Sequence, residues 1–525
     1  MERFSGVFVF HFAMLFAECA PMVNIEEIYK DASNLFCFRP GARSGLELGC
    51  FMVPMVLLSQ IVFGKQHPFI FQDQWQVYYN AVVLMGLCTV LLLVVLKGSR
   101  NLTTFAIIPL ICFAIAKTAQ FKWKGGTIEI SLVACMLLYL AIFLAVTITL
   151  PYSFTLGELM VVCQSLTILF VDYAVSIYSR LRFVFPSSFF TAATNVDELP
   201  FTRTEVTFVL QTFLIGTLIT GLLLVPVFYY LAVVSEPAEL WIGSLSFYAI
   251  CLLSVMAIFL PCFYMTLAGV NPVVWAVKFL SLTPTRTYLI IYWLLVVSFS
   301  LTVVIWKSSY NATNSDPPGT PNIIVRKIFH ILAVAIFIPG IFYDPALLHV
   351  CSAVATSLFL FVEFVRFGRV KPFGEMVHGY LAPFVDERDS GPLILTHVYL
   401  LIGCALPLWL FPLDYHKLSD NGCALILYSG VLSIGIGDAA ASVVGVKFGK
   451  HQWKGTTKTV EGTVASCLSQ FFIIFLLKTN GMIINFVPVS VAIILSSLLE
   501  AFTTQIDNFV LPLFTYCLLA MTCVT

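Results

Sequence analysis

Charged side chains are scarce in this sequence. Asp, Glu, Lys and Arg make up only 11% of the 525 residues, whereas 59% of the residues are hydrophobic and the mean hydropathy is +0.95. So little polar material cannot cover a water-soluble globule of this size, which excludes a soluble protein. The formal net charge is zero, so the total charge favours no acidic macromolecular partner, and we expect no nucleic-acid binding.

Several catalytic and metal-binding motifs are also missing. The fifteen cysteines include no CxxC pair, so the sequence indicates neither a zinc site nor a disulfide framework. The motifs GxSxG and HExxH and the phosphate-binding loop GxxxxGK[ST] are absent, and no basic stretch is interleaved with aromatic residues. These absences exclude the common forms of serine hydrolysis, zinc proteolysis and Walker-type nucleotide binding.

Long apolar runs are abundant. Each crossing of a bilayer core takes about 20 residues of helix, and such runs recur along the whole chain, for instance at 128–150, 206–233 and 242–268. Strand-like alternation is absent, and backbone polar groups that face lipid must be satisfied within their own segment, so helices are the remaining architecture. The sequence predicts an all-α polytopic integral membrane bundle with about 13–15 transmembrane helices.

The largest break in composition lies at residues 307–325, where Pro, Gly, Ser and Asn are concentrated. Such a composition is typical of a linker. It divides the chain into N-terminal transmembrane helices at 1–306, whose role the sequence does not show, and a C-terminal transmembrane part at 326–525. Most of the clustered polar residues lie in the C-terminal part.

The charges of the loops orient this C-terminal part in the membrane. Counting the spans places the loops 307–327, 366–392, 446–463 and 500–508 on one side, which carries eleven Lys and Arg residues against two on the other side. The positive-inside rule puts the lysine-rich side in the cytosol. A soluble ligand that binds these loops is therefore a cytosolic solute.

The same orientation predicts the state of a glycosylation sequon that begins at Asn311. Because a cytosolic segment never meets the lumenal glycosylation machinery, we expect Asn311 to carry no glycan. Mass spectrometry of peptides from the purified protein checks this expectation, and a glycan on Asn311 would overturn the orientation.

A local cluster of cations lies at residues 447–458, where four of twelve residues are lysine, interleaved with glycine and threonine. Glycine lets backbone N–H groups approach an anion, and hydroxyl and ammonium groups complete such a cradle, so the segment suits a polyphosphate. An ordinary positive-inside loop that touches lipid headgroups is the alternative interpretation.

Carboxylates are few in the same region: only Asp438, Glu461, Glu500 and Asp507 occur from residue 438 to 525. A charge at the bilayer centre costs about 3 kcal/mol on insertion scales, so Asp438 is a functional candidate, with a simple lysine partner as the alternative. We expect the glycines before Asp438 to break its helix. Glu500 and Asp507 are seven residues apart, which predicts one face of one helix. Such oxygen ligands suit Mg²⁺ or another hard cation that bridges phosphates.

A second polar group lies earlier in the C-terminal part. Arg326, Lys327 and His330 fall within about one helical turn at the entrance of a span, and Asp389 precedes another span. Taken alone, the basic residues are typical of a membrane-surface anchor, and Asp389 of a solvated loop. As functional groups they would neutralise a phosphoryl group or accept a proton from a hydroxyl.

The chain resembles the dolichol kinases in six segments that occur in order: RKIFHILAVAIFIPGIFYD, FVEFVRFGRVKP, DERDSGPLILTHVYLLIGCALPLWL, GDAAASVVGVKFGK, KGTTKTVEGT and LLEAFTTQIDNFVLPL. The resemblance is close over residues 322–516 and thinner upstream. It implies a multi-pass enzyme of the endoplasmic reticulum membrane with its active site facing the cytosol. Such an enzyme transfers the γ-phosphoryl group of CTP to the terminal hydroxyl of dolichol, with a divalent cation such as Mg²⁺ or Ca²⁺. The product, dolichyl phosphate, carries glycans for protein N-glycosylation.

Carried onto this sequence, the resemblance and the polar clusters together predict three sets of site residues. The catalytic set is Asp438, Arg326, Lys327, His330 and Asp389. The metal-binding set is Asp438, Glu461, Asp507 and Glu500. The CTP-binding set is Val446, Lys447, Gly449, Lys450, Trp453, Lys454, Gly455, Thr456, Thr457, Lys458, Thr459, Glu461 and Gly462.

Two alternatives stay open. Within the enzymes, a CTP-dependent kinase or cytidylyltransferase acting on diacylglycerol, phytol or phosphatidate is the main competitor. A lipid transporter is a rival from another class, and it predicts acidic residues spread over both halves of the chain and over membrane depth. Here the acidic residues singled out above gather in the C-terminal part, which favours an enzyme.

Overall fold

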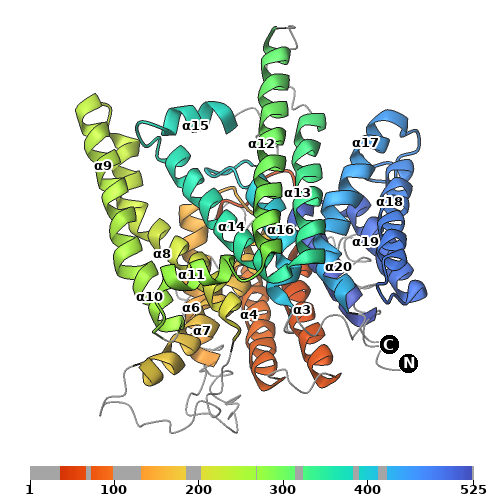
Figure 1. The fold of residues 1–525 in the computed structure, drawn as a ribbon, viewed down its shortest axis with the longest axis horizontal. Helices are drawn as coiled ribbons and strands as arrows, with labels where there is room; N and C mark the ends of the chain where they lie inside the picture. The colour runs from red at the N-terminus through yellow and green to blue at the C-terminus, as the bar shows by residue number, and fades with distance from the viewer. Residues whose placement is uncertain are drawn as a thin grey trace. The chain divides into compact units, whose positions relative to one another are not determined.

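The computed structural model describes residues 36–66, 72–98, 132–184, 203–267, 269–313, 323–381, 389–411 and 423–522. These residues are overwhelmingly helical, and among them there is no β-strand (Figure 1). Within the described ranges, nine helices are long and apolar enough to cross a membrane, and five shorter apolar helices accompany them. The all-α polytopic architecture is therefore confirmed.

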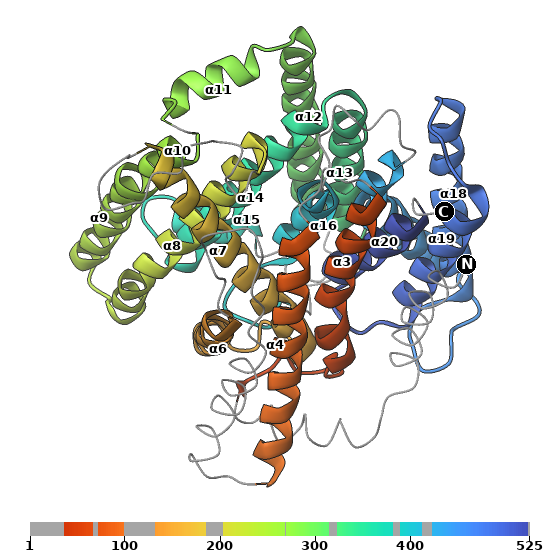
Figure 2. The ribbon, with the colours of Figure 1, turned by 90° about the horizontal axis from the view of Figure 1, so that it is seen from below.

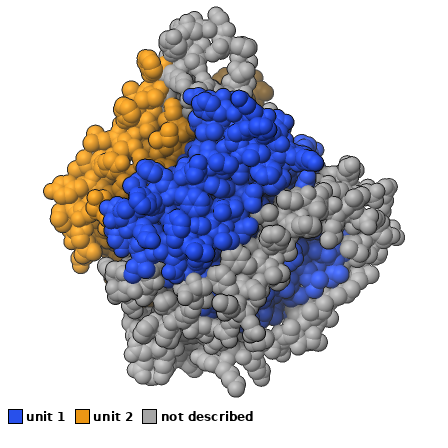
Figure 3. Space-filling view, turned by 90° about the vertical axis from the view of Figure 1, so that its right-hand side faces the viewer, with its two compact units in different colours: residues 1–171, 390–392, 410–525 blue, residues 172–389, 393–409 orange. Residues whose placement is uncertain are grey.

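The chain folds into two compact units, each built from separate stretches of sequence (Figure 3). Unit 1 comprises residues 1–171, 390–392 and 410–525, and unit 2 comprises residues 172–389 and 393–409. The helices before residue 172 thus join those after residue 409 in unit 1, whereas the rest of the expected N-terminal part belongs to unit 2. The predicted functional division, between helices at 1–306 and a kinase part at 326–525, is distinct from these two structural units and stays a prediction.

Unit 1 brings the two ends of the chain together. Helix α3 packs on α4 and also on α20, and α17 to α20 form a group around the π-helical segment η6 (Figures 1 and 2). Its elements are α3 (Leu46–Gln66), α4 (Gln72–Gly98), α6 (Leu132–Thr149), the first part of α7 (Leu156–Val184), η5 (Ala424–Tyr428), η6 (Val431–Asp438), α17 (Ala439–Phe448), α18 (Val460–Thr479), α19 (Phe486–Phe502) and α20 (Asp507–Thr522).

Unit 2 is built around α8, which packs on both α9 and α14. Its aromatic core includes Phe228, which contacts Phe247, Phe364 and Phe367. Its elements are the end of α7, α8 (Glu205–Val233), α9 (Pro237–Ser254), η2 (Val255–Phe259), α10 (Leu260–Thr266), α11 (Pro272–Leu280), α12 (Pro284–Thr313), α13 (Ile323–Tyr343), α14 (Pro345–Phe367), α15 (Gly374–Leu381) and α16 (Thr396–Leu410).

Charged side chains buried in unit 2 are paired. Glu363 is 1% exposed and accepts two hydrogen bonds from Arg366, at 2.7 and 2.5 Å, and one from the Ile394 backbone N–H at 2.6 Å. Pairing of this kind is what a buried carboxylate requires. Large apolar side chains on α9 and α12 are exposed instead, for example Leu252 and Leu295, as expected of surfaces that face lipid.

The linker expected at 307–325 is shorter than the composition suggests. Helix α12 continues through Thr313 and α13 begins at Ile323, so the first seven expected linker residues are helical. Asn311 lies in this last part of α12. The intervening residues 314–322 lie outside the described residues.

Candidate functional site

The lysine-rich segment forms a short hairpin between α17 and α18. The Val460 N–H donates to the His451 carbonyl at 2.8 Å, and the Trp453 N–H donates to the Lys458 carbonyl at 3.0 Å. Gly455 lies at the tip with φ +80°, a conformation that favours glycine, and a Cβ there would meet open space. The turn at the tip therefore depends on a glycine backbone conformation, and the space beside Gly455 is open.

The base of this hairpin is anchored to neighbouring helices. The indole of Trp453 donates to Thr463 Oγ1 at 3.0 Å and its ring lies 5.3 Å from that of Phe502. Thr459 caps α18, since its hydroxyl accepts the Gly462 N–H at 3.2 Å. Trp453 and Thr459, both predicted to bind CTP, thus hold the hairpin in place.

Two glycines near the hairpin lie where α17 and α18 approach closely. A Cβ on Gly462 would lie 2.9 Å from the Ala441 carbonyl oxygen in α17, and one on Gly449 would lie 2.6 Å from Cγ2 of Thr459, the N-cap of α18. The N–H groups of Gly449 and Gly462 already donate within the protein. The contacts thus give these glycines a requirement in packing, and the anion cradle that the sequence predicts from them stays a prediction.

Lys458 points from the hairpin into a cluster of carboxylates. Its ammonium group forms an ion pair with Glu500, whose side chain is 3% exposed, while the lysine side chain is 32% exposed. Burial lowers the pKa of the Lys458 ammonium, but the surrounding carboxylates, Glu500 first and then Asp438 and Asp507, outweigh that effect and raise the pKa above its ordinary value. Lys458 is therefore protonated at neutral pH. We call Lys458, Glu500, Asp438 and Asp507 the Lys458 cluster.

Asp438 reaches this cluster from the end of η6. The helix is not broken at Gly435 and Gly437 as expected: residues 431–438 are π-helical and lead directly into α17. A Cβ on Gly437 would lie 2.6 Å from Gln470 Nε2, so the close approach of α18 requires this glycine. Asp438, the last residue of this segment, is only 4% exposed. Such π-helical insertions are frequent at functional sites.

Glu500 and Asp507 do not share one helix, contrary to the prediction. Helix α19 ends at Phe502, Thr503 is extended with φ −70° and ψ 137°, and α20 begins at Asp507. The Thr503 hydroxyl accepts the Gln505 N–H at 3.2 Å, a local bond that competes with helix continuation. Both carboxylates nevertheless act on Lys458, one from each side of the break.

Glu461 makes different contacts from the other predicted metal ligands. It accepts the His451 N–H at 3.2 Å and lies 2.6 Å from His451 Nδ1, at a partly exposed position. Within the described ranges, no group of three or more His, Cys, Asp or Glu side chains is arranged to hold a metal ion by itself. A cation bound here would therefore need further oxygen ligands from its partner, as Mg²⁺ commonly takes from phosphates.

The remaining predicted CTP-binding residues lie on the outside of unit 1. These exposed residues are Val446, Lys447, Lys450, Lys454 and Thr457, with Thr456 half-buried. Exposed lysines around a fixed hairpin suit a multiply charged anion, because their positive charges attract the anion from solution. Their role in nucleotide binding stays a prediction.

The other predicted catalytic residues belong to unit 2. His330 on α13 is 6% exposed, and Lys327 one turn earlier is half-buried. Asp389 accepts the Leu395 N–H at 3.1 Å and the Thr396 hydroxyl at 2.6 Å. Arg326 is in the first turn of α13, and its side chain lies outside the described residues. That these side chains join the Lys458 cluster in one site stays a prediction.

The sequence model of the dolichol kinases matches residues 25–407 of this chain. That match covers well over half of the chain. The chain belongs to the dolichol kinase family. The likeness upstream of residue 322, which the motifs alone showed only thinly, therefore includes most of the N-terminal helices.

Individual members of the dolichol kinase family align over different shares of the chain. Dolichol kinase of Homo sapiens is 38% identical over 316 residues, and that of Mus musculus 39%; each alignment covers 58% of this chain and 58% of the relative. Dolichol kinase EVAN of Arabidopsis thaliana is 28% identical over 536 residues, 93% of this chain and 89% of the relative. No solved structure matches the chain.

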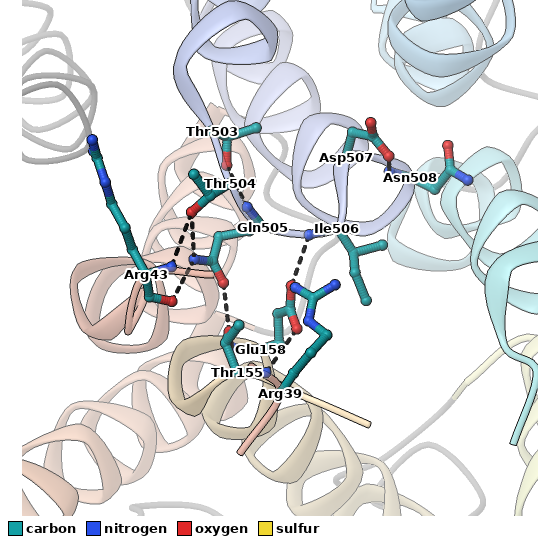
Figure 4. Close-up of polar contacts among 10 residues, drawn as sticks. All are labelled: Arg39, Arg43, Thr155, Glu158, Thr503, Thr504, Gln505, Ile506, Asp507 and Asn508. Carbon is teal, nitrogen blue, oxygen red and sulfur yellow. Dashed lines mark hydrogen bonds and ion pairs between the residues drawn. The ribbon is translucent and has the colours of Figure 1, made fainter. Parts of the chain in front are cut away.

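Sequence reasoning missed one polar network of this dolichol kinase family member. The side chains of Thr155 and Glu158, at the start of α7, and the backbone of Arg43, before α3, hold residues 503–506, which connect Glu500 to Asp507 (Figure 4). The one local signal was Thr155-Leu-Gly-Glu158, the spacing of a capping box at the start of a helix. Contacts between residues about 350 positions apart leave no other trace in a single sequence.

Proposed function

We propose that this protein is a dolichol kinase that transfers the γ-phosphoryl group of CTP to the terminal hydroxyl of dolichol. One observation carries the proposal: in a member of this family, Lys458 lies among three carboxylates that come from three separate segments. Clustering four charges in an otherwise apolar chain is costly, and such clusters in membrane proteins are usually functional.

In this proposal the hairpin binds the triphosphate. The exposed Lys450 and Lys454 attract it, and Lys458 at the inner end neutralises the charge that develops on the transferred group. Phosphoryl transfer needs little covalent chemistry from the protein, so positioning and charge neutralisation supply most of the acceleration.

The carboxylates suit a divalent cation that arrives with the nucleotide. Asp438 and Asp507 would hold it together with phosphate oxygens, because hard cations prefer oxygen ligands and Mg²⁺ rarely uses a cage made of protein alone. The cation supplies positive charge to the β- and γ-phosphates. Within the protein, Glu500 keeps Lys458 oriented toward this position through their ion pair.

The acceptor hydroxyl would approach from the membrane, with Asp438, His330 or Asp389 as candidates to take its proton. The lysine-rich side faces the cytosol in this proposal, in the endoplasmic reticulum membrane, so that CTP enters from the cytosol and dolichol from the bilayer. The product would be dolichyl phosphate for protein glycosylation.

The proposal is tested by incubating the purified protein in lipid nanodiscs with Mg²⁺ and γ-labelled CTP, ATP or GTP, each against dolichol, phytol and diacylglycerol. We expect labelled dolichyl phosphate with CTP as the preferred donor. Label on phytol or diacylglycerol in preference to dolichol would replace the acceptor, and a cytidyl group on the product would indicate a cytidylyltransferase. Absence of transfer to every acceptor by a well-folded sample would refute the proposal.

A further inference from the structure

The carboxylate of Glu158 joins the starts of two helices in unit 1. It accepts the Thr155 N–H at 2.9 Å, which closes a capping box at the start of α7, and it accepts the Ile506 N–H at 2.7 Å, just before α20 begins (Figure 4). Both N–H groups belong to the unsatisfied ends of helices, where a negative charge is favourable. One carboxylate therefore fixes α20 to α7.

Arg39 neutralises this carboxylate. Its guanidinium donates to Glu158 Oε1 at 2.6 Å, and the two side chains are 2% and 1% exposed. The backbone N–H of Arg39 also donates to the Phe154 carbonyl at 2.8 Å, which holds its segment against the start of α7. A buried carboxylate without such a partner would be strongly unfavourable, so the arginine is required for the contact with Ile506.

Gln505 ties the same segment to two further points. Its Oε1 accepts the Thr155 hydroxyl at 2.5 Å, and its Nε2 donates to the Arg43 carbonyl at 3.1 Å. Gln505 and Thr155 are both fully buried. Residues 503–506 are thus held through side chains and backbone by parts of the chain that precede them by about 350 residues or more.

Two glycines show how closely these parts fit. A Cβ on Gly157 would lie 1.8 Å from the Gly45 carbonyl oxygen. Gly45 has φ +61°, and a Cβ there would lie 2.6 Å from Gln505 Oε1. Neither position accepts a larger residue without displacing the contacts around Gln505, so the segment has little freedom to shift.

The held segment separates two members of the Lys458 cluster. Glu500 lies in the last turn of α19 and Asp507 is the first residue of α20, directly after Ile506. A movement of residues 503–506 therefore changes the position of the Asp507 carboxylate relative to Lys458. Misplacement by about 1 Å at a reacting centre costs up to about 100-fold in rate.

We propose that a buried network in unit 1 acts as a positioning device for the Lys458 cluster, by holding residues 503–506 and through them Asp507. Its members are Arg39, Thr155, Glu158 and Gln505. This assigns a role to residues ahead of 306, and it rests on the proposed function. None of the four is proposed to touch the substrates.

The test compares Glu158→Gln with the wild-type protein by hydrogen exchange and by kinetics. Glutamine keeps the shape but removes the charge, so we expect amide exchange in peptides covering 503–508 to accelerate by at least about tenfold. We expect kcat to fall about ten- to 100-fold and the half-saturating Mg²⁺ concentration to rise, with an unchanged KM for dolichol. A loss of folded protein alone would lower the apparent kcat and leave the half-saturating concentrations unchanged.

Asp172→Asn in unit 2 is the matched control. Asp172 is likewise buried, accepts from the Arg203 guanidinium at 2.6 Å and from Gln211 at 2.6 Å, and belongs to unit 2, whereas residues 503–506 belong to unit 1. We expect this variant to lose stability without a change in exchange at 503–508 or in the Mg²⁺ dependence. If Glu158→Gln does not fold, Thr155→Val is used instead, and Thr155→Ser, which keeps the hydroxyl, should restore most of the lost activity.

Unchanged exchange at 503–508 in Glu158→Gln would overturn the inference, and so would accelerated exchange with unaltered kinetics. A wild-type protein that transfers no phosphoryl group would refute the proposed function itself. If only the positioning role is wrong, the wild-type protein is active and the variants show it. The two failures are therefore distinguishable.

Discussion

Replacement of Lys458 by methionine is expected to lower phosphoryl transfer by at least about 1,000-fold, because in the proposed function this one residue supplies both a phosphate contact and the neutralising charge among three carboxylates. Methionine keeps much of the length of the side chain and removes the charge. The measurement is kcat for labelled dolichyl phosphate formation at saturating CTP. Lys478→Ala serves as the charge-matched control, since Lys478 is exposed in the last turn of α18 and lies outside the cluster.

Because Lys458 is paired with Glu500, its replacement also affects the stability of the fold, so the effects on stability and activity must be separated. Removing only the lysine leaves the Glu500 carboxylate buried without its partner, which costs about 3–5 kcal/mol of stability. The double variant Lys458→Met, Glu500→Gln removes that charge, so we expect thermal stability to recover while activity stays lost. Recovery of activity in the double variant would mean that Lys458 serves the fold and does not act on the phosphoryl group.

Two members of the candidate site could be selected from the sequence because their signals are local. A carboxylate within an apolar run and four lysines within twelve residues are unusual in so hydrophobic a chain, and Asp438 and Lys458 do meet in the same cluster. Helical architecture followed from the apolar runs, because the bilayer leaves few alternatives to a helix.

What the sequence could not show depends on contacts between distant residues. In the sequence, Thr503 is an ordinary residue between two carboxylates that are seven residues apart. In the structure the helix is interrupted there, where the Thr503 hydroxyl accepts the Gln505 N–H and the Glu158 carboxylate accepts the Ile506 N–H. The sequence likewise does not show that the backbone of α17 lies beside Gly462, where a Cβ would be 2.9 Å from the Ala441 carbonyl oxygen. The periodicity of apolar residues shows which face of a helix is apolar, but it does not show which distant segment of the chain packs against that helix.

Asp438→Asn is expected to lower kcat by at least about 100-fold while the protein still inserts and folds. Asparagine has nearly the same volume but no charge, so in the proposed function it would weaken both cation binding and any proton acceptance at this position. Because Asp438 is one of the carboxylates that raise the pKa of Lys458, its removal also leaves the lysine less strongly held. The measurement is the rate as a function of Mg²⁺ concentration, with thermal unfolding as the check on folding.

Glu461→Gln is the informative comparison, since the sequence predicts both carboxylates as metal ligands. Glu461 contacts His451 on the partly exposed side of the hairpin, whereas Asp438 acts on Lys458 at a position that is 4% exposed. We therefore expect Glu461→Gln to cost less than about tenfold, mainly through a higher KM for CTP as the hairpin loosens. Equal losses of activity in Glu461→Gln and Asp438→Asn would indicate that Glu461 is also a ligand of the proposed cation. A larger loss in Glu461→Gln would move the centre of the chemistry from the Lys458 cluster to the outer face of the hairpin.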